Sequence, residues 1–444
     1  MHKMIPLCRI TLLLAWLLPV WAYAQEPLSL AQAVSKGMEN NYAIRISELD
    51  KNIAANNNTW GAAGRWPQLS FSLPGNYSRF NNPGSFLAGR ENVAGNLDLD
   101  WVLFDGFGIQ ANKERFSLLE EQSAGNAAII IETNIQAIVL GYNQVLVEEA
   151  QLDVLQDVLD NSKERLNYEA YRKNLGTGST FELLQFENAV LIDSTNLIAQ
   201  YLNARNARRN LNLVMGVPVD RQFVLTDSLQ RNFPVYDLRD LQDRMLANNR
   251  NVRNQYTQLA IRQQDSRIAR AGLYPTFSIG AGTTYSFGNV IQRNRNPDTM
   301  DEMPTITNKV SAFDYTAGFT IAFNLFNGGN VKRQIENAQI SQEIAVLQID
   351  ELSRALTNEL YARFDDYRAR RQMLAIREAN LRVATQNLEM AEERFEKGLI
   401  NSFDYRNIQL QYLDIQLGQL NALRDLKETD TELLRLVGGL VRQN

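Results

Sequence analysis

Acidic side chains are the groups in this sequence whose type and spacing could do chemistry. Asp98 and Asp100 alternate with leucines in LDLDWVLFDG, residues 97–106. Neighbouring carboxylates can act as acid and base, or they can attract cations. The usual partners for nucleophilic or metal chemistry are scarce, because the only histidine (His2) and the only cysteine (Cys8) lie in an N-terminal segment that we expect to be removed. The sequence therefore predicts neither an enzyme, nor a cofactor, nor a metal site.

That N-terminal segment has the form of an export signal. Lys3 and Arg9 precede an apolar stretch, and the AYA that ends at Ala24 has the small-x-small pattern cut by signal peptidase. We therefore predict a signal peptide over residues 1–24 and an exported mature protein. The net charge of −5 disfavours nucleic acid as a partner.

The alternation around the carboxylates predicts strands with one apolar and one polar face. Leucines 97 and 99 and Trp101 share one face, whereas Asp98 and Asp100 share the other. Such segments are predicted at 67–80, 93–104, 275–287 and 314–326. About ten residues of this pattern suit a transmembrane β-strand, so the two aspartates are expected to face an aqueous lumen. The residues expected to face the membrane are Trp101, Phe277, Phe319 and Phe323.

The sequence contains a tandem repeat of one structural unit. LAQAVSKGMENNYAIR at 30–45 aligns with LRDLQDRMLANNRNVR at 238–253, and further on Gly176 aligns with Gly398. A repeat of this kind predicts the same elements in each half. The expected units are a first repeat at 25–216, a linker at 217–236 and a second repeat at 237–444.

Long helices are expected to fill most of each repeat. An opening helix of roughly 35 residues is predicted first, ended by an aromatic-proline pair. From 107 to 173 and from 329 to 397 there is no proline, and apolar residues recur at coiled-coil spacing. A helix of about 67 residues is roughly 100 Å long, which suits a structure that crosses a wide aqueous gap. Hairpin tips are predicted at 174–179 and 397–402, and the polar stretch 289–304 is predicted to be a surface loop.

Four strands cannot close a barrel alone. An unpaired strand edge in lipid leaves orphan amides that cost several kcal/mol each. The chain is therefore expected to share its barrel with other copies, two copies giving eight strands and three giving twelve. A soluble antiparallel sheet with one solvated face is the alternative.

These features resemble the TolC-type outer membrane efflux proteins, also called outer membrane factors. The resemblance rests on the export signal, the tandem repeat of strand pair and long hairpin, the glycine tips, and the junctions LFDG at 103–106 and LFNG at 325–328. It covers residues 25–444 and implies an α+β membrane protein. In that fold a homotrimer forms a twelve-stranded transmembrane β-barrel, four strands per chain, continued by a twelve-helix periplasmic α-barrel of coiled-coil hairpins.

The same resemblance implies a function and partners. It implies a passive exit duct in the outer membrane, reaching into the periplasm, for a tripartite efflux or type I secretion system. Its partners would be outer membrane lipid, a periplasmic adaptor (membrane fusion) protein and an inner-membrane transporter of the RND, ABC or MFS type. The alternative is an exported coiled-coil structural or adhesin-like protein without a pore.

Residues at the tips are implied by the resemblance as well. The implied adaptor contacts are Leu175, Gly176, Lys397, Gly398 and Leu399. The implied pore constriction is formed by Asp404 and Asn407, with Glu182 in the first repeat. Phe395 and Ile400 stand where the family has a gate-locking tyrosine and an arginine, so apolar packing is expected to hold the gate. Both acidic residues could instead serve as caps of the helices that begin there.

Overall fold

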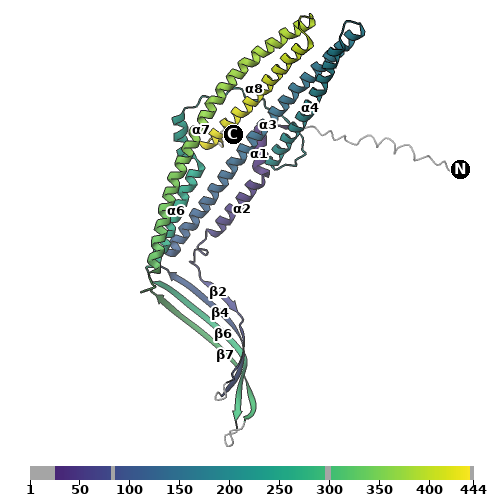
Figure 1. Ribbon diagram of the computed structural model, residues 1–444. Coiled ribbons are helices and arrows are strands. Elements are labelled where there is room, and N and C mark those ends of the chain that lie inside the picture. The colour runs from purple at the N-terminus through teal and green to yellow at the C-terminus, as the bar shows by residue number, and fades with distance from the viewer. Residues whose placement is uncertain (1–25, 82–85, 296–301, 441–444) are drawn as a thin grey trace, which may run out of the picture.

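Two helices of 67 residues run through most of the molecule (Figure 1). They are α3 (Gly108–Asn174) and α7 (Asn330–Glu396), and each returns as a shorter helix, α4 (Thr180–Met215) and α8 (Ser402–Leu436). The computed structural model describes residues 26–81, 86–295 and 302–440. The predicted signal peptide, 1–24, lies outside the described residues. The helical tips and the sheet lie at opposite ends of the molecule (Figure 1).

The opening helix of each repeat is broken, and the expectation of one continuous helix was wrong. In the first repeat α1 (Leu30–Asn40) is followed by α2 (Tyr42–Asn57), and in the second α5 (Leu238–Asn248) is followed by α6 (Arg250–Ala271). The break falls at Asn41 and Asn249, whose backbones are extended and cannot continue a helix.

These two asparagines make the same joint in both repeats. The Asn41 side chain caps α2, and its Nδ2 donates to the carbonyl oxygen of Val214 near the end of α4, at 2.8 Å. Asn249 caps α6 in the same way and donates to the carbonyl oxygen of Leu436, at 2.9 Å. One amide therefore starts a helix and ties it to the end of the hairpin of its own repeat, which explains why NN recurs in the aligned sequences.

The sheet is antiparallel, in the order β2–β4–β6–β7, and β3 also pairs with β4. Its strands are β2 (Gln68–Ser72), β3 (Gly75–Arg79), β4 (Leu87–Phe104), β6 (Thr276–Arg295) and β7 (Glu302–Ala322). The predicted strand 67–80 is interrupted before Gly75, where Pro74 cannot donate to the ladder. Within the described residues, β7 and the β2–β3 side of the sheet are the open edges.

Four strand ends differ from the prediction by more than one residue. Strand β4 begins at Leu87 rather than at 93, and β6 ends at Arg295 rather than at 287. Strand β7 runs from Glu302 to Ala322 rather than from 314 to 326, so that Phe323 lies just beyond it. Of the polar stretch predicted to be a surface loop, residues 289–295 and 302–304 are strand, because the β6–β7 ladder continues past Asn289 to Arg295; residues 296–301 lie outside the described residues. Backbone hydrogen bonds hold this extension, and they do not require alternating apolar side chains.

Strand register confirms the two faces that the alternation predicted. Leu99 pairs with Ala281, and Trp101 pairs with Ile279, so these side chains share the apolar face. Asp98 pairs with Gly282 and Asp100 with Gly280 on the opposite face. A Cβ atom at residue 282 would lie 2.7 Å from the Asp98 carboxylate, so glycine there leaves room for the aspartate.

A small second sheet lies in the inter-repeat linker. Strand β1 (Glu26–Leu28) pairs in parallel with β5 (Phe223–Leu225), which falls within the predicted linker 217–236. The phenol of Tyr142 donates to the carbonyl oxygen of Leu28 at 2.8 Å. The segment at the start of the first repeat is thus paired with the linker that follows this repeat.

Candidate functional site

The helical tips contain most of the residues predicted from the family resemblance. Helix α3 ends at Asn174 and α7 at Glu396, so both turns fall within the predicted tips. Gly176 has φ of 75° and Gly398 has φ of 70°, and a Cβ at either would meet nothing within 4 Å. Glycine is therefore favoured there by the left-handed backbone and not by lack of space.

The predicted adaptor contacts lie on the surface of the tips. Leu175 is 60% exposed and Leu399 is 70% exposed, although both are large apolar residues. Lys397 is exposed and lies 3.7 Å from Glu393. Two further aromatic residues, Phe181 and Phe403, are exposed beside them. The sequence analysis did not select this pair as contacts, although they align in the repeat.

The predicted constriction residues lie just past the two tips. Asp404 and Asn407 are exposed on the first turns of α8, whereas Glu182 is half-buried on α4. The backbone N–H of Asp404 donates to the Asn401 side chain at 2.9 Å, which makes Asn401 the cap of α8. Asp404 also lies in the first turn of the helix, where a negative charge is favoured by the helix dipole.

Phe395 and Ile400, the predicted gate-packing residues, belong to one apolar cluster beneath the tips. Phe395 is buried and stacks on Tyr405, with ring centroids 5.1 Å apart and an interplanar angle of 22°. Phe186 on α4 meets Phe395 edge-on at 5.9 Å. Because Phe186 belongs to the first hairpin and Phe395 to the second, this cluster joins the two hairpins.

A buried ion pair, which the sequence analysis missed, joins the hairpins close by. Arg406 on α8 lies 2.6 Å from Asp193 on α4, and the two side chains are 13% and 1% exposed. Ser162 on α3 donates its Oγ proton to the other Asp193 oxygen at 2.6 Å. Three helices therefore meet at one carboxylate.

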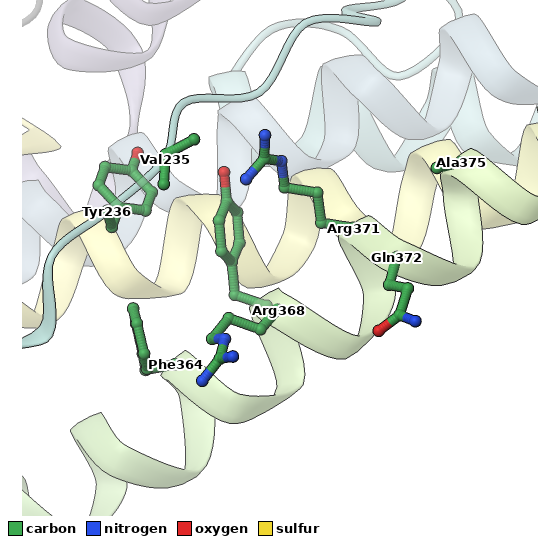
Figure 2. A pocket seen from close by; sticks show the side chains of 8 residues that line it. Val235, Tyr236, Phe364, Arg368, Arg371, Gln372 and Ala375 are labelled. Carbon is green, nitrogen blue, oxygen red and sulfur yellow. The ribbon is translucent and has the colours of Figure 1, made fainter.

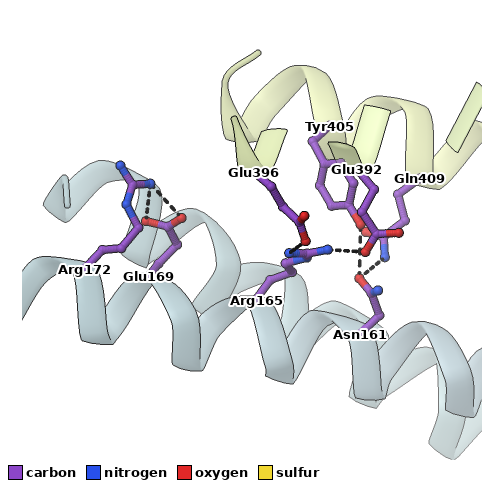
Figure 3. Close-up of polar contacts among 8 residues, drawn as sticks. All are labelled: Asn161, Arg165, Glu169, Arg172, Glu392, Glu396, Tyr405 and Gln409. Carbon is purple, nitrogen blue, oxygen red and sulfur yellow. Dashed lines mark hydrogen bonds and ion pairs between the residues drawn. The ribbon is translucent and has the colours of Figure 1, made fainter. Parts of the chain in front are cut away.

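A second set of polar contacts lies nearer the tip (Figure 3). Arg165 on α3 pairs with Glu392 and, at 3.4 Å, with Glu396, both on α7. The Arg165 guanidinium lies over the Tyr405 ring at 5.5 Å. Asn161 Oδ1 accepts from the Tyr405 hydroxyl at 3.3 Å. Burial raises the pKa of the Tyr405 phenol, so its hydroxyl stays protonated and can donate.

We refer to these polar residues together as the inter-hairpin network. Its members are Asn161, Ser162, Arg165, Asp193, Glu392, Glu396, Tyr405, Arg406 and Gln409. They come from α3, α4, α7 and α8, so the network spans both hairpins. Buried charges are retained only when they are paired and hydrogen-bonded, which favours a fixed relative position of the two tips.

At the other end of the molecule, the structure places the predicted barrel residues at the helix-proximal end of the sheet. Trp101 Nε1 donates to the carbonyl oxygen of Arg65 at 2.9 Å, in the turn that precedes β2. Phe277 and Phe319 lie on the same apolar face and touch at a centroid distance of 6.2 Å. Phe323 is exposed just beyond β7.

A pocket beside the linker shows how the linker is anchored (Figure 2). Tyr236 donates its hydroxyl proton to Asp430 at 2.8 Å, and Tyr367 donates to the carbonyl oxygen of Pro234 at 2.7 Å. Burial raises the pKa of Tyr367 to about 12 and that of Tyr236 further. Both phenols are thus occupied as structural donors, and this pocket presents no acid–base pair.

Comparisons with known proteins agree with this geometry. Residues 241–439 match the family of outer membrane efflux proteins. The fold is similar to that of the outer-membrane channel OprN (TM-score 0.72, 18% identity, 92% of this chain and 90% of that chain). It is also similar to the Campylobacter jejuni CmeC outer membrane channel (0.74, 13%, 92% and 85%) and to the open state of the Neisseria gonorrhoeae MtrE outer membrane channel (0.68, 15%, 93% and 89%). No curated protein matches the sequence. The predicted resemblance to the TolC-type outer membrane efflux proteins is confirmed, by sequence over most of the second repeat and by fold over the described chain.

Proposed function

We propose that three copies of this chain form a passive exit duct in the outer membrane that extends into the periplasm. One observation carries the proposal: a two-faced antiparallel sheet with open edges is joined directly to helices of 67 residues. The sheet supplies an apolar face for lipid and a polar face for water. The helices supply a wall roughly 100 Å long for an aqueous gap.

The open edges support closure with further copies. Strand β7 is free on one side of the sheet, and the β2–β3 side is free on the other. The helical layer also exposes apolar residues on its lateral helices. They include Leu191, Ile198, Tyr201 and Leu202 on α4, and Ile340, Ile344, Leu347 and Ile376 on α7. Because the two edges differ, contact between them would be head-to-tail, and it gives a closed ring when the rotation from copy to copy closes on itself.

We infer that the tips contact a periplasmic adaptor, which links the duct to an inner-membrane pump. The exposed apolar residues support this inference, since Leu175 and Phe181 at the first tip and Leu399 and Phe403 at the second are all exposed. Clusters of exposed apolar residues mark protein contact sites. The pump, and not the duct, would choose the substrate.

We also infer that the tips form a cation-selective gate. Three Asp404 side chains around one axis would attract cations and repel anions. The inter-hairpin network would hold each pair of hairpins in position beneath that ring. Asn407, one turn further along α8, is also exposed and would add a polar ring.

Conductance across a planar bilayer tests the duct and the gate together. Wild type should form trimers and carry a small cation-selective current, and Asp404→Asn should lose that selectivity. Asp414→Asn is the matched control, because Asp414 is exposed on α8 away from the tip. If Asp404→Asn keeps the wild-type selectivity, Asp404 does not form the selective gate and acts only as a charge at the start of α8. Silence from well-inserted protein, with a stoichiometry other than three, would instead favour a coiled-coil protein without a pore.

A further inference from the structure

One row of side chains on the apolar face of the sheet is polar and includes a cation. Strand register places Val93, Phe287 and Ser311 in one row across β4, β6 and β7. The next row on the same face consists of Glu91, Asn289 and Lys309, and β3 adds Tyr77 to it. Arg79 follows two residues later on β3, and so it also lies on this face.

The height of this row matches a lipid interface. Trp101 and Glu91 are on one face of β4, and ten residues separate them. At about 3.3 Å per residue this spans roughly 33 Å along the strand, and a strand tilt of about 40° reduces it to roughly 25 Å along the membrane normal. The outward apolar band of an outer-membrane barrel is about 25 Å tall. With Trp101 at the periplasmic interface, the Lys309 row therefore lies at the headgroups of the outer leaflet.

No salt bridge joins Arg79 or Lys309 to a carboxylate within the described residues, although the Glu91 charge acts on Arg79 at longer range. Arg79 Nε donates to the Tyr77 hydroxyl at 2.8 Å, which orients the guanidinium and leaves its terminal nitrogens available. Lys309 is exposed and makes no ion pair with any described residue. The one acid of the row, Glu91, accepts from Asn289 Nδ2 at 2.9 Å. Guanidinium and ammonium groups beside a hydroxyl are suited to phosphate oxygens.

We propose that Arg79, Tyr77 and Lys309 bind the phosphate of an anionic outer-leaflet lipid, of the phosphorylated glycolipid class to which lipopolysaccharide belongs. This proposal rests on the proposed barrel, because closure places β7 of one chain beside β3 of the next. Lys309 of one chain and Arg79 of its neighbour then lie on the same outward face of adjacent strands. The complete site therefore forms between two chains.

The test uses trimers purified from outer membranes, with bound lipopolysaccharide measured per chain by mass spectrometry. The double variant Arg79→Gln/Lys309→Gln should carry at least threefold less bound lipopolysaccharide per chain than wild type, and it should still conduct as a trimer. Arg90→Gln should retain it, because Arg90 is equally exposed on β4 but points to the polar face beside Ser78. Each single variant should show a smaller loss, which keeps the test decisive if the double variant does not assemble.

Several results would overturn the lipid site. Equal lipid on wild type and on both the double and the single variants would do so, as would equal loss in Arg90→Gln. Displacement of the lipid by an equal concentration of inorganic phosphate would assign the residues to the free anion. Wild-type trimers that conduct but carry no phosphorylated lipid would refute this site while leaving the duct intact. Wild type that neither conducts nor forms trimers would refute the duct itself, and the lipid site with it.

Discussion

Loss of the Arg406 guanidinium should part the two hairpins of a chain beneath their tips. In Arg406→Leu, the Asp193 carboxylate stays buried at 1% exposure and keeps Ser162 as its hydrogen-bond donor. Removing one partner of a buried ion pair costs about 3–5 kcal/mol. Since about 1.4 kcal/mol is a factor of ten, the equilibrium between joined and parted hairpins should shift by roughly two to four orders of magnitude.

The assay is single-channel conductance at fixed voltage, with thermal unfolding measured in parallel. Arg406→Leu should show a larger mean conductance and a lower melting temperature than wild type. The double variant Asp193→Leu/Arg406→Leu should return the mean conductance and the melting temperature most of the way to their wild-type values, because replacing a buried pair by apolar side chains is often neutral. Lys163→Gln is the control, since Lys163 pairs with Asp160 on the surface of α3 near the same level.

Two results would refute this reasoning. If Arg406→Leu conducts and melts like wild type, the buried pair does not hold the hairpins together. If the double variant is as open and as unstable as Arg406→Leu, then the unpaired carboxylate is not the cause of the change. A large effect of Lys163→Gln would show that any charge change near the tip perturbs the assay.

Three further predictions concern the helical core. Gly438→Ala should lower the free energy of unfolding by about 1–3 kcal/mol in a denaturant titration, because φ is 66° and a Cβ would meet a backbone oxygen at 2.8 Å; Gly318→Ala, with nothing within 4 Å, should change it little. Asn249→Ala should cost about 1–2 kcal/mol, as the α6 cap and the bond to Leu436 are lost together, and an unchanged melting temperature would contradict the joint. Burial raises the pKa of Glu132 above its unfolded value, so its contribution to stability is present at low pH and is lost as pH rises through the folded pKa. Glu132→Gln should therefore raise the melting temperature at pH 7 more than at pH 4, and an equal rise at both would argue against the raised pKa.

Much of the fold follows from periodicity and repetition. Period-2 alternation predicted the two faces of the strands, because a buried or lipid-covered face tolerates few polar side chains. The long proline-free segments predicted helices whose ends the structure places at Asn174 and Glu396. The breaks at Asn41 and Asn249 were missed because the apolar pattern runs through them. A cap that bonds to a distant hairpin is a tertiary contact, and no local propensity encodes it.

The inter-hairpin network was also outside the reach of the sequence. The tip residues could be named because the family resemblance counts them from the tip glycines. Arg406 and Asp193 are far apart in sequence, and each alone reads as a solvated charge on a long helix. The two repeats also differ at this point: Gly398 follows Gly176 by 222 residues, and the residue 222 positions before Arg406 is Leu184.

That mismatch between the repeats has a mechanical consequence. The offset of 222 residues that relates Arg406 to Leu184 also relates Asp193 to Ile415, so the positions equivalent to this ion pair both hold aliphatic residues. In a ring of three chains, hairpin contacts between neighbouring chains would alternate with hairpin contacts within a chain. At the height of Arg406, the two kinds of contact would differ in chemistry. Aliphatic contact is non-directional, whereas separating a buried ion pair leaves an uncompensated buried charge. A sideways force on the tips would therefore separate neighbouring chains before it separated the two hairpins of one chain. The tips of the trimer would then move as three units, one per chain, and not as six separate hairpins.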